Sequence, residues 1–139
     1  MKRVFLDSNV ILDSILHREG YETVDQILQF GRNMYIKNCT SILSFANIAY
    51  ILRKYRSDRD DLEKTMKALF DSIKILPMGD MQVYDALRAG GPDFEDSLQV
   101  ACADEACCDL IITRDKKHYR GIPIPVYTPV EFYRAVTGD

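Results

Sequence analysis

The sequence predicts an α/β fold in which helices cover a parallel sheet of about five strands, and two observations support this prediction. Short apolar runs alternate along the 139 residues with longer segments whose apolar side chains recur at helical spacing. No repeat, linker or low-complexity segment interrupts this alternation. Strands separated by helices are joined by right-handed crossovers into a parallel sheet. At this length we expect one domain over residues 1–139.

The N-terminal half is predicted to hold two strands and four helices. Apolar runs at residues 3–6 and 34–36 predict the strands. Apolar side chains at helical spacing predict the helices, at residues 8–17, 21–32, 42–55 and 58–72. Gly20 separates the first two helices. Suitable N-cap residues precede the third and fourth helices, namely Thr40 or Ser41 and Ser57 or Asp58.

The C-terminal half is predicted to hold three strands and three helices, at residues 73–76, 80–89, 94–107, 109–113, 125–127 and 129–136. Pro77 ends the first of these strands, and Gly90 begins the Gly-Gly-Pro sequence that ends the first helix. Asp93 is a suitable N-cap for the next helix, and Pro129 suits the first turn of the last one. The strand at 109–113 is nearly all apolar, which indicates a central place in the sheet. A polar loop follows it.

Composition and charge narrow the class of protein. Hydrophobic residues make up 47% and charged residues 28% of the chain, as in an ordinary soluble globular domain. The sequence has no apolar stretch long enough to span a membrane and no recognisable signal peptide, so we expect a cytoplasmic protein. A formal net charge of −3 argues against nonspecific nucleic-acid binding through a broadly basic surface. It does not argue against a nuclease, because a cluster of metal-binding carboxylates itself lowers the charge.

Polar side chains stand near the predicted ends of several strands. Asp7 directly follows the first strand, and Asp115 comes two residues after Thr113 at the end of the fourth. Asn47 lies in the second turn of the helix after the second strand, and Asp96 in the first turn of the helix that leads to the fourth. Ligands of open parallel sheets bind outside the carboxyl ends of the strands. We therefore expect Asp7, Asn47 and Asp115 at that edge, whereas the connection after the third strand must bring Asp96 there.

Each of these residues also has a purely structural interpretation. Asp7 or Ser8 can cap the first helix. Asp96 can close a capping box, and Asp115 can begin a turn. Asn47 can be a solvated helix residue. Taken together, however, apolar strands that lead to carboxylates at two separate ends favour a site for a hard cation such as Mg²⁺ or Mn²⁺, which prefer oxygen ligands.

The chain resembles the PIN-domain family of nucleases in four stretches, FLDSNVILD, TSILSFANIAYILRKY, DFEDSLQVACA and DLIITRDKKHY. The resemblance covers nearly the whole chain and is closest to the small bacterial VapC-type toxins of toxin–antitoxin pairs. It implies a three-layer α/β/α sandwich and a ribonuclease that uses Mg²⁺ or Mn²⁺ held by three or four acidic residues. It also implies RNA as the substrate, a homodimer, and an antitoxin protein as a partner.

The resemblance assigns roles to individual residues. Asp7 matches the first acidic residue of the family, with Asn9 as its polar neighbour. Asp96 matches the third acidic residue and Asp115 the fourth, with Thr113 as the usual hydroxyl companion. The three aspartates are the expected catalytic residues and, together with Asn47, the expected metal ligands, and Asn9 and Thr113 are expected to orient them.

One position departs from the family pattern. The second acidic residue is commonly a Glu on the helix after the second strand, and the matching residue here is Asn47. An amide oxygen can bind a hard cation or its water but brings no charge, so we expect weaker metal binding or loss of activity. Asp115 stands where Asn is frequent in this branch, which offsets part of the loss. Glu95 is a reserve ligand that points about a third of a turn away from Asp96.

Basic residues beside Asp115 are candidates for substrate binding. Arg114, Lys116 and Lys117 can contact RNA phosphates, and the alternative is a solvated loop. His118 can act as a general base, although a metal-activated water makes one unnecessary.

Three functions remain open at this point. The leading one is a metal-dependent endoribonuclease of the toxin type. The second is a catalytically weak or inactive PIN-fold module that binds RNA or protein, because Asn47 replaces the usual Glu. The third is a phosphatase of the haloacid-dehalogenase type or a receiver domain, both of which also place Asp at strand ends. The phosphatase requires a second Asp where this chain has Asn9, and the receiver's acidic pair and Lys are not evident in the sequence.

Overall fold

The structure is a computed structural model, and it describes residues 1–55 and 58–138. In chain order these residues form β1 (Lys2–Leu6), α1 (Ser8–Leu16), α2 (Tyr21–Arg32), β2 (Ile36–Ser41), α3 (Ile42–Tyr55), α4 (Arg59–Ser72), β3 (Lys74–Leu76), α5 (Asp80–Ala89), α6 (Phe94–Glu105), β4 (Leu110–Ile112), the 3-10 helix η1 (Lys116–Tyr119), β5 (Val126–Tyr127) and α7 (Pro129–Thr137). The predicted alternation of strands and helices is confirmed. Among the described residues, every helix is too short or too polar to cross a membrane.

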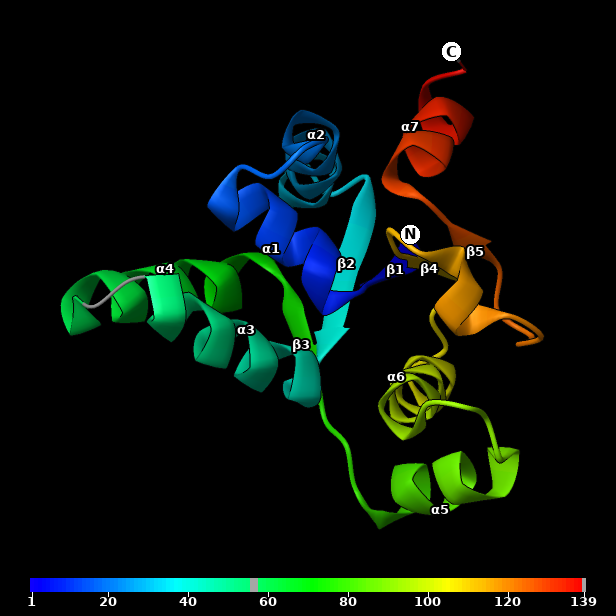
Figure 1. The fold of residues 1–139 in the computed structure, drawn as a ribbon. Helices are drawn as coiled ribbons and strands as arrows, with labels where there is room; N and C mark the ends of the chain where they lie inside the picture. Colours follow the sequence, from blue (N-terminus) through cyan, green and yellow to red (C-terminus); the bar gives the residue numbers. More distant parts are fainter. Residues whose placement is uncertain (56–57, 139) are drawn as a thin grey trace.

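The five strands form one parallel sheet in the order β3-β2-β1-β4-β5, which confirms the predicted fold class (Figure 1). β1 pairs with β2 on one side and with β4 on the other, so the direction of strand succession reverses at β1. The carboxyl ends of β1 and β4 therefore flank a topological switch point, where open α/β sheets bind ligands. Leu6 lies opposite Ile112, which brings the residues that follow these two strands side by side.

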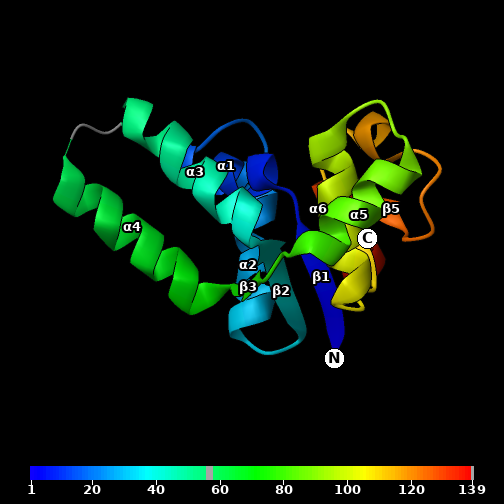
Figure 2. The same ribbon diagram turned by 90° about the horizontal axis from the view of Figure 1, so that it is seen from below.

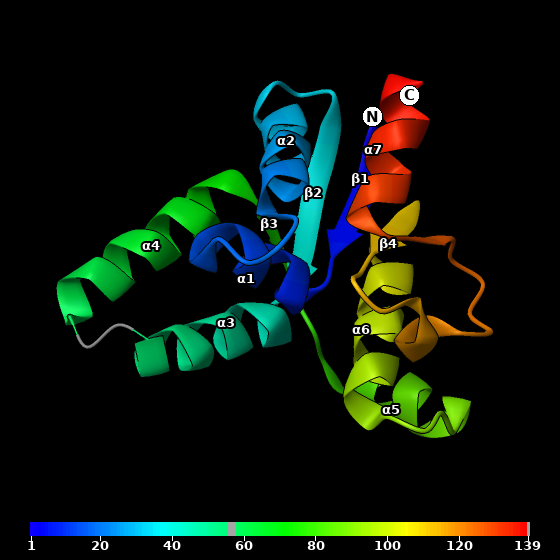
Figure 3. The same cartoon turned by 45° about the horizontal axis from the view of Figure 1, so that its top comes forward.

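Helices cover both faces of the sheet, as a three-layer sandwich requires. Val4 and Leu6 of β1 contribute to a core shared with α1, α2, α3, α4 and α7. Phe5 points to the other face, where it shares a core with Cys102 and Ala103 of α6. Successive strand side chains point to opposite faces, so one buried strand supplies both cores. Figures 2 and 3 show α5 outside α6 on this second face, on the far side of the sheet from α1 and α2.

The prediction of the second strand at residues 34–36 is wrong. β2 spans Ile36–Ser41, and Met34 lies in the preceding turn with a φ of 64°. The sequence of this strand has no apolar run, because two of its buried residues, Asn38 and Thr40, are polar. Their side chains donate hydrogen bonds to backbone carbonyls of α2 and β1, at 3.2 and 2.8 Å. A buried strand that satisfies polar side chains in this way lacks the apolar run on which the prediction depended.

The remaining boundaries agree with the prediction to within two residues. Ser41 caps α3, because its Oγ accepts a hydrogen bond from the backbone N–H of Ser44 at 2.9 Å. Asp58 caps α4 by accepting from the backbone N–H of Asp60 at 2.9 Å. The alternative cap, Ser57, lies outside the described residues.

Gly31 of α2 lies against β2, where a Cβ would stand 2.5 Å from Nδ2 of the buried Asn38. Ala is a better helix former than Gly by about 1 kcal/mol. We nevertheless expect Gly31→Ala to lower the free energy of unfolding by about 1–3 kcal/mol, because the amide must be displaced within a packed core. Urea denaturation followed by circular dichroism measures the change. In an Asn38→Ala background the same substitution should cost less, and an equal cost in both backgrounds would contradict the clash.

Candidate active site

Asp7 stands where β1 ends and α1 begins. Its backbone carbonyl accepts a hydrogen bond from the N–H of Val10 at 3.0 Å, but its carboxylate caps none of the described helices. Instead, Oδ2 accepts from Thr113 Oγ1 at 2.9 Å, and Oδ1 accepts from Ser8 Oγ at 3.5 Å. Since Thr113 follows β4, this contact joins the carboxyl ends of the two central strands. The side chain of Asp7 therefore faces the switch point of the sheet, although it also contacts Ser8, the first residue of α1.

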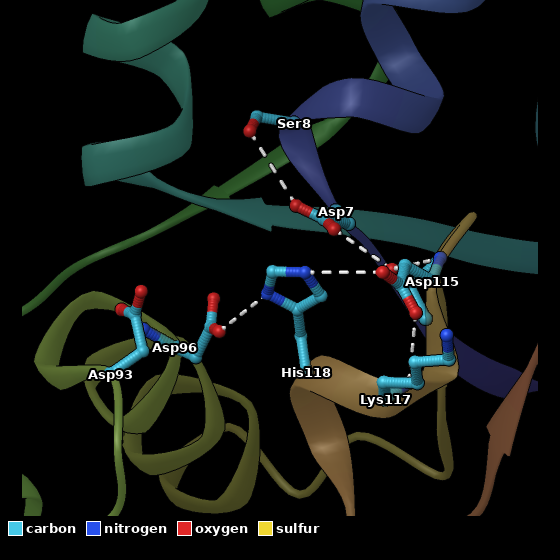
Figure 4. A network of polar contacts seen from close by, with 8 residues as sticks. Asp7, Ser8, Asp93, Asp96, Asp115, Lys117 and His118 are labelled. Carbon is cyan, nitrogen blue, oxygen red and sulfur yellow. Dashed lines mark hydrogen bonds and ion pairs between the residues drawn. The ribbon is translucent and has the colours of Figure 1, made fainter.

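His118 lies between the other two predicted acidic residues, as Figure 4 shows. Its Nδ1 is 2.9 Å from Asp96 Oδ2, and its Nε2 is 3.2 Å from Asp115 Oδ2. Asp115 also begins η1, because its Oδ1 accepts from the backbone N–H of Lys117 at 3.1 Å. Asp115 thus has both the turn-forming position and a side chain that faces the site. From the sequence, His118 was a candidate only for a general base, and this bridging position was not predicted.

A buried polar network holds the start of α6, and therefore Asp96, at this edge of the sheet. Gln99 lies one turn after Asp96; it donates through Nε2 to Ser44 Oγ at 2.9 Å and accepts from Ser41 Oγ at 2.5 Å. Ser41 ends β2 and Ser44 lies in the first turn of α3, and all three side chains are buried. Gln99 was not predicted from the sequence. Gln99 lies three residues before Cys102, which packs against the sheet, and this helical spacing could have placed Gln99 on the buried face of α6.

The side chains of Asp7, Asp96, Asp115 and His118 help to line a cleft of about 300 Å³. Its lining residues are Asp7, Ser8, Asn9, Asp93, Glu95, Asp96, Thr113, Arg114, Asp115 and His118. Five of them are carboxylates, and oxygen donors of this kind suit Mg²⁺ or Mn²⁺. Within the described part of the chain, however, no three acidic, His or Cys side chains are grouped closely enough to hold one ion. The imidazole of His118 separates Asp96 from Asp115, so a cation shared by these carboxylates requires the ring to move.

The electrostatics of the cleft favour a positive charge among the carboxylates. Burial raises the pKa of Asp7 above its ordinary value of 3.8, although the hydrogen bond from Thr113 acts in the opposite direction. Burial also raises the pKa of Asp96, against the effect of its hydrogen bond with His118. That hydrogen bond, together with the negative charge of Asp96, raises the pKa of His118. The carboxylates on either side of the ring thus favour the protonated, positively charged form of His118.

We expect Asp7→Asn to stabilise the metal-free protein at neutral pH, because the neutral amide avoids the cost of ionising a desolvated carboxyl. Because the pKa of Asp7 is raised in the folded state, its contribution to the free energy of unfolding decreases with increasing pH. The decrease begins at pH 3.8, continues through the folded-state pKa and is complete above it. The variant lacks that fall. Its melting temperature should therefore exceed that of the native protein by a margin that grows from pH 4 to pH 7. Calorimetric melting in chelator measures this margin, and a constant margin would contradict the cause.

Asn47 and Glu95 interact with each other. Nδ2 of Asn47, on α3, donates to Oε1 of Glu95, in the first turn of α6, at 2.8 Å. Glu95 lines the cleft, whereas Asn47 is not one of the described residues that line it. Asn9 also lines the cleft, next to Asp7 and Ser8.

The three predicted substrate-binding residues have different surroundings. Arg114 lines the cleft, but its Nη1 lies 2.9 Å from Oδ1 of the buried Asp13 on α1. Lys116 Nζ lies 3.1 Å from Glu131 Oε2. Lys117 is exposed, and its ammonium forms no ion pair with any residue that the structure describes. Of the three, Lys117 therefore keeps the most available positive charge.

In a comparison with known protein families, the model of the PIN domain matches residues 3–117 of this chain. The chain belongs to the PIN domain family. The match begins in β1 and extends into η1, so it contains Asp7, Asp96 and Asp115. A search of curated proteins finds no match.

Solved structures share this PIN fold at low sequence identity. A toxin–antitoxin complex from Klebsiella pneumoniae aligns with a TM-score of 0.69 at 19% identity, covering 91% of this chain and 97% of that chain. VapBC-1 from nontypeable Haemophilus influenzae gives 0.70 at 14% identity, with 92% and 98% covered. VapBC2 from Rickettsia felis, in a structure with a DNA fragment from its promoter, aligns with a TM-score of 0.68 at 13% identity, covering 91% of this chain and 98% of that chain. At these identities the likeness establishes the fold.

Proposed function

We propose that this PIN-domain protein is a metal-dependent endoribonuclease that hydrolyses RNA phosphodiester bonds. The observation that supports it most is the cleft at the carboxyl ends of β1 and β4, where Asp7, Asp96 and Asp115 arrive from three separate elements. Among the described residues, the carboxylate of Asp7 has the hydroxyls of Ser8 and Thr113 and the backbone of Ser8 as hydrogen-bond partners, and it forms no direct ion pair. A desolvated carboxylate without a direct ionic partner costs stability, and such groups are typical of functional sites.

In this proposal Asp7, Asp96 and Asp115 hold Mg²⁺ or Mn²⁺, directly or through water, and His118 withdraws from between the last two. A cation held there would supply Lewis-acid chemistry to the phosphodiester, namely activation of the attacking water and neutralisation of charge on the phosphoryl and leaving oxygens. Thr113 keeps Asp7 oriented, because its hydroxyl proton is donated to Oδ2.

The basic residues beside the cleft bind the substrate strand in this proposal. Lys117 is exposed and contacts a phosphate without first breaking an ion pair in the described structure. Arg114 and Lys116 contact phosphates only after exchanging Asp13 and Glu131 for the substrate. We therefore expect Lys117 to contribute most to RNA affinity at low salt.

We further propose that the protein is the toxin half of a toxin–antitoxin pair, that it acts in the cytoplasm, and that it forms a homodimer. Its PIN fold is shared with chains of a Klebsiella pneumoniae toxin–antitoxin complex and of VapBC-1 from Haemophilus influenzae. Tyr50 and Tyr55 on α3 are 58% and 65% exposed and offer apolar surface for a partner chain.

Two observations favour a second candidate function, a PIN-fold module that binds RNA or protein with little or no catalysis. α3 presents the neutral Asn47 where the family commonly has Glu, and His118 separates Asp96 from Asp115 in the described structure. Calorimetric titration with Mn²⁺ discriminates the two functions, because the module is expected to bind no metal at millimolar concentrations.

The nuclease proposal is tested by incubating the purified protein with end-labelled single-stranded RNA and Mn²⁺ or Mg²⁺. We expect internal cleavage that stops when the cation is chelated, and little cleavage of DNA of the same sequence. If neither the native protein nor Asn47→Glu cleaves RNA in Mn²⁺, the enzyme assignment is wrong.

A further inference from the structure

We infer that Glu95, held in place by Asn47, is a fourth metal-binding carboxylate of this site. The inference rests on the proposed function and names a residue and a geometry that the family pattern does not supply. In that pattern the second carboxylate comes from the helix after the second strand. Here that helix contributes an amide, and the carboxylate comes from α6.

The position of Glu95 supports this role. It is in the first turn of α6 next to Asp96, and an α-helix turns by about 100° per residue. Without a further contact, its side chain would diverge from that of Asp96. The bond from Asn47 Nδ2 to Glu95 Oε1, at 2.8 Å, instead draws the carboxylate toward α3, and Glu95 lines the same cleft as Asp7, Asp96 and Asp115.

The chemistry of the contact also supports it. A carboxylate with a structural role is commonly paired with Lys or Arg, but no described Lys or Arg forms an ion pair with Glu95. An amide donor fixes the direction of the carboxylate without neutralising its charge. Glu95 therefore has a neutral amide rather than a cation as its side-chain partner, in a cleft that Asp93 and Asp96 also line, and carboxylates gathered in this way attract a cation.

The same contact gives Asn47 a different role from that of a ligand. Only an N–H can donate to the carboxylate, so Nδ2 faces Glu95. Asn47 is thus a positioning residue that acts through Glu95. A glutamate at position 47 would repel Glu95, so the chain carries the charge at one of these two positions and a neutral donor at the other.

Titration calorimetry with Mn²⁺ on the purified full chain tests the inference through binding rather than activity. We expect Glu95→Gln to weaken Mn²⁺ binding by about ten-fold or more. Asn47→Leu, which removes the donor at similar size, should weaken binding by a smaller factor. Glu63→Gln, which changes an exposed glutamate on α4, is the matched control and should bind as the native protein does. The double variant Asn47→Glu/Glu95→Gln should recover most of the lost affinity. In that variant the residue at position 47 on α3 supplies the carboxylate, and the residue at position 95 supplies the amide donor.

The outcomes are distinguishable. Melting curves in chelator identify any variant that fails to fold, and the conservative Glu95→Gln change affects an exposed side chain. Native protein that binds Mn²⁺ while Glu95→Gln binds equally well overturns this inference and leaves the proposed nuclease intact. Native protein that binds no Mn²⁺ overturns both. If Glu95→Gln weakens binding but Asn47→Leu does not, the positioning role of Asn47 is overturned and Glu95 stands as the ligand.

Discussion

Asp7→Asn is expected to reduce RNA cleavage in Mn²⁺ by roughly a thousand-fold or more, the scale of losing a central electrostatic group of an active site. The amide keeps the size of the side chain and can still accept the hydrogen bond from Thr113. It removes the charge at the point where β1 and β4 meet. Single-turnover cleavage of end-labelled RNA, with enzyme in excess, measures the effect on the chemical step.

The control for this prediction is Asp71→Asn. Asp71 is an exposed residue of α4 that pairs with Lys67 at 3.5 Å, and it should leave cleavage unchanged. Because Asp7→Asn is also expected to melt at a higher temperature than the native protein in chelator, loss of activity cannot be attributed to unfolding. Cleavage by Asp7→Asn within a few-fold of the native rate would show that Asp7 is not a central ligand.

Gln99→Leu is expected to have the second-largest effect, a loss of about 2–3 kcal/mol of unfolding free energy. Leu has a similar size but cannot bond with Ser41 or Ser44, so their buried hydroxyls lose their partner on α6. The start of α6 then loses its buried hydrogen bonds to β2 and α3 and keeps the exposed one from Asn47 to Glu95, so Asp96 is held less firmly. Cleavage should therefore fall as well, even at temperatures where the variant is folded.

Urea denaturation measures the stability change, and cleavage at 20 °C below the melting temperature measures the functional one. Gln26→Leu, an exposed change on α2, is the control for the same chemical substitution. A Gln99→Leu protein that is destabilised yet cleaves at the native rate would show that the network supports the fold without positioning Asp96.

Much of the fold was predictable because its central strands are simple. β1 and β4 are buried apolar runs, and the carboxylates that follow them stand at the same edge of the sheet by topology alone. β2 was predicted at the wrong place because its polar residues are buried and satisfied by backbone carbonyls. That information lies in the tertiary structure rather than in local periodicity.

The site divides in the same way. Asp7 and Asp115 could be placed from sequence, since Asp7 directly follows β1 and Asp115 comes three residues after the end of β4. The local pattern could not place Asp96, which only the family resemblance assigned to the site, because its position depends on the buried bonds of Gln99 to elements about 55 residues earlier in the chain. The contact between Asn47 and Glu95 could not be predicted from the sequence either, because it joins residues of two helices that are 48 positions apart in the chain.

The central claim is that the cleft at the ends of β1 and β4 binds the divalent cation of a nuclease. Anomalous scattering from crystals soaked in Mn²⁺ tests it most directly. We predict a manganese peak in contact with a carboxylate oxygen of Asp7 and within direct or water-mediated reach of Asp96 and Asp115, with the His118 ring turned out from between them. A well-diffracting crystal with no peak in this cleft, or with manganese only at sites that do not include Asp7, would contradict the account.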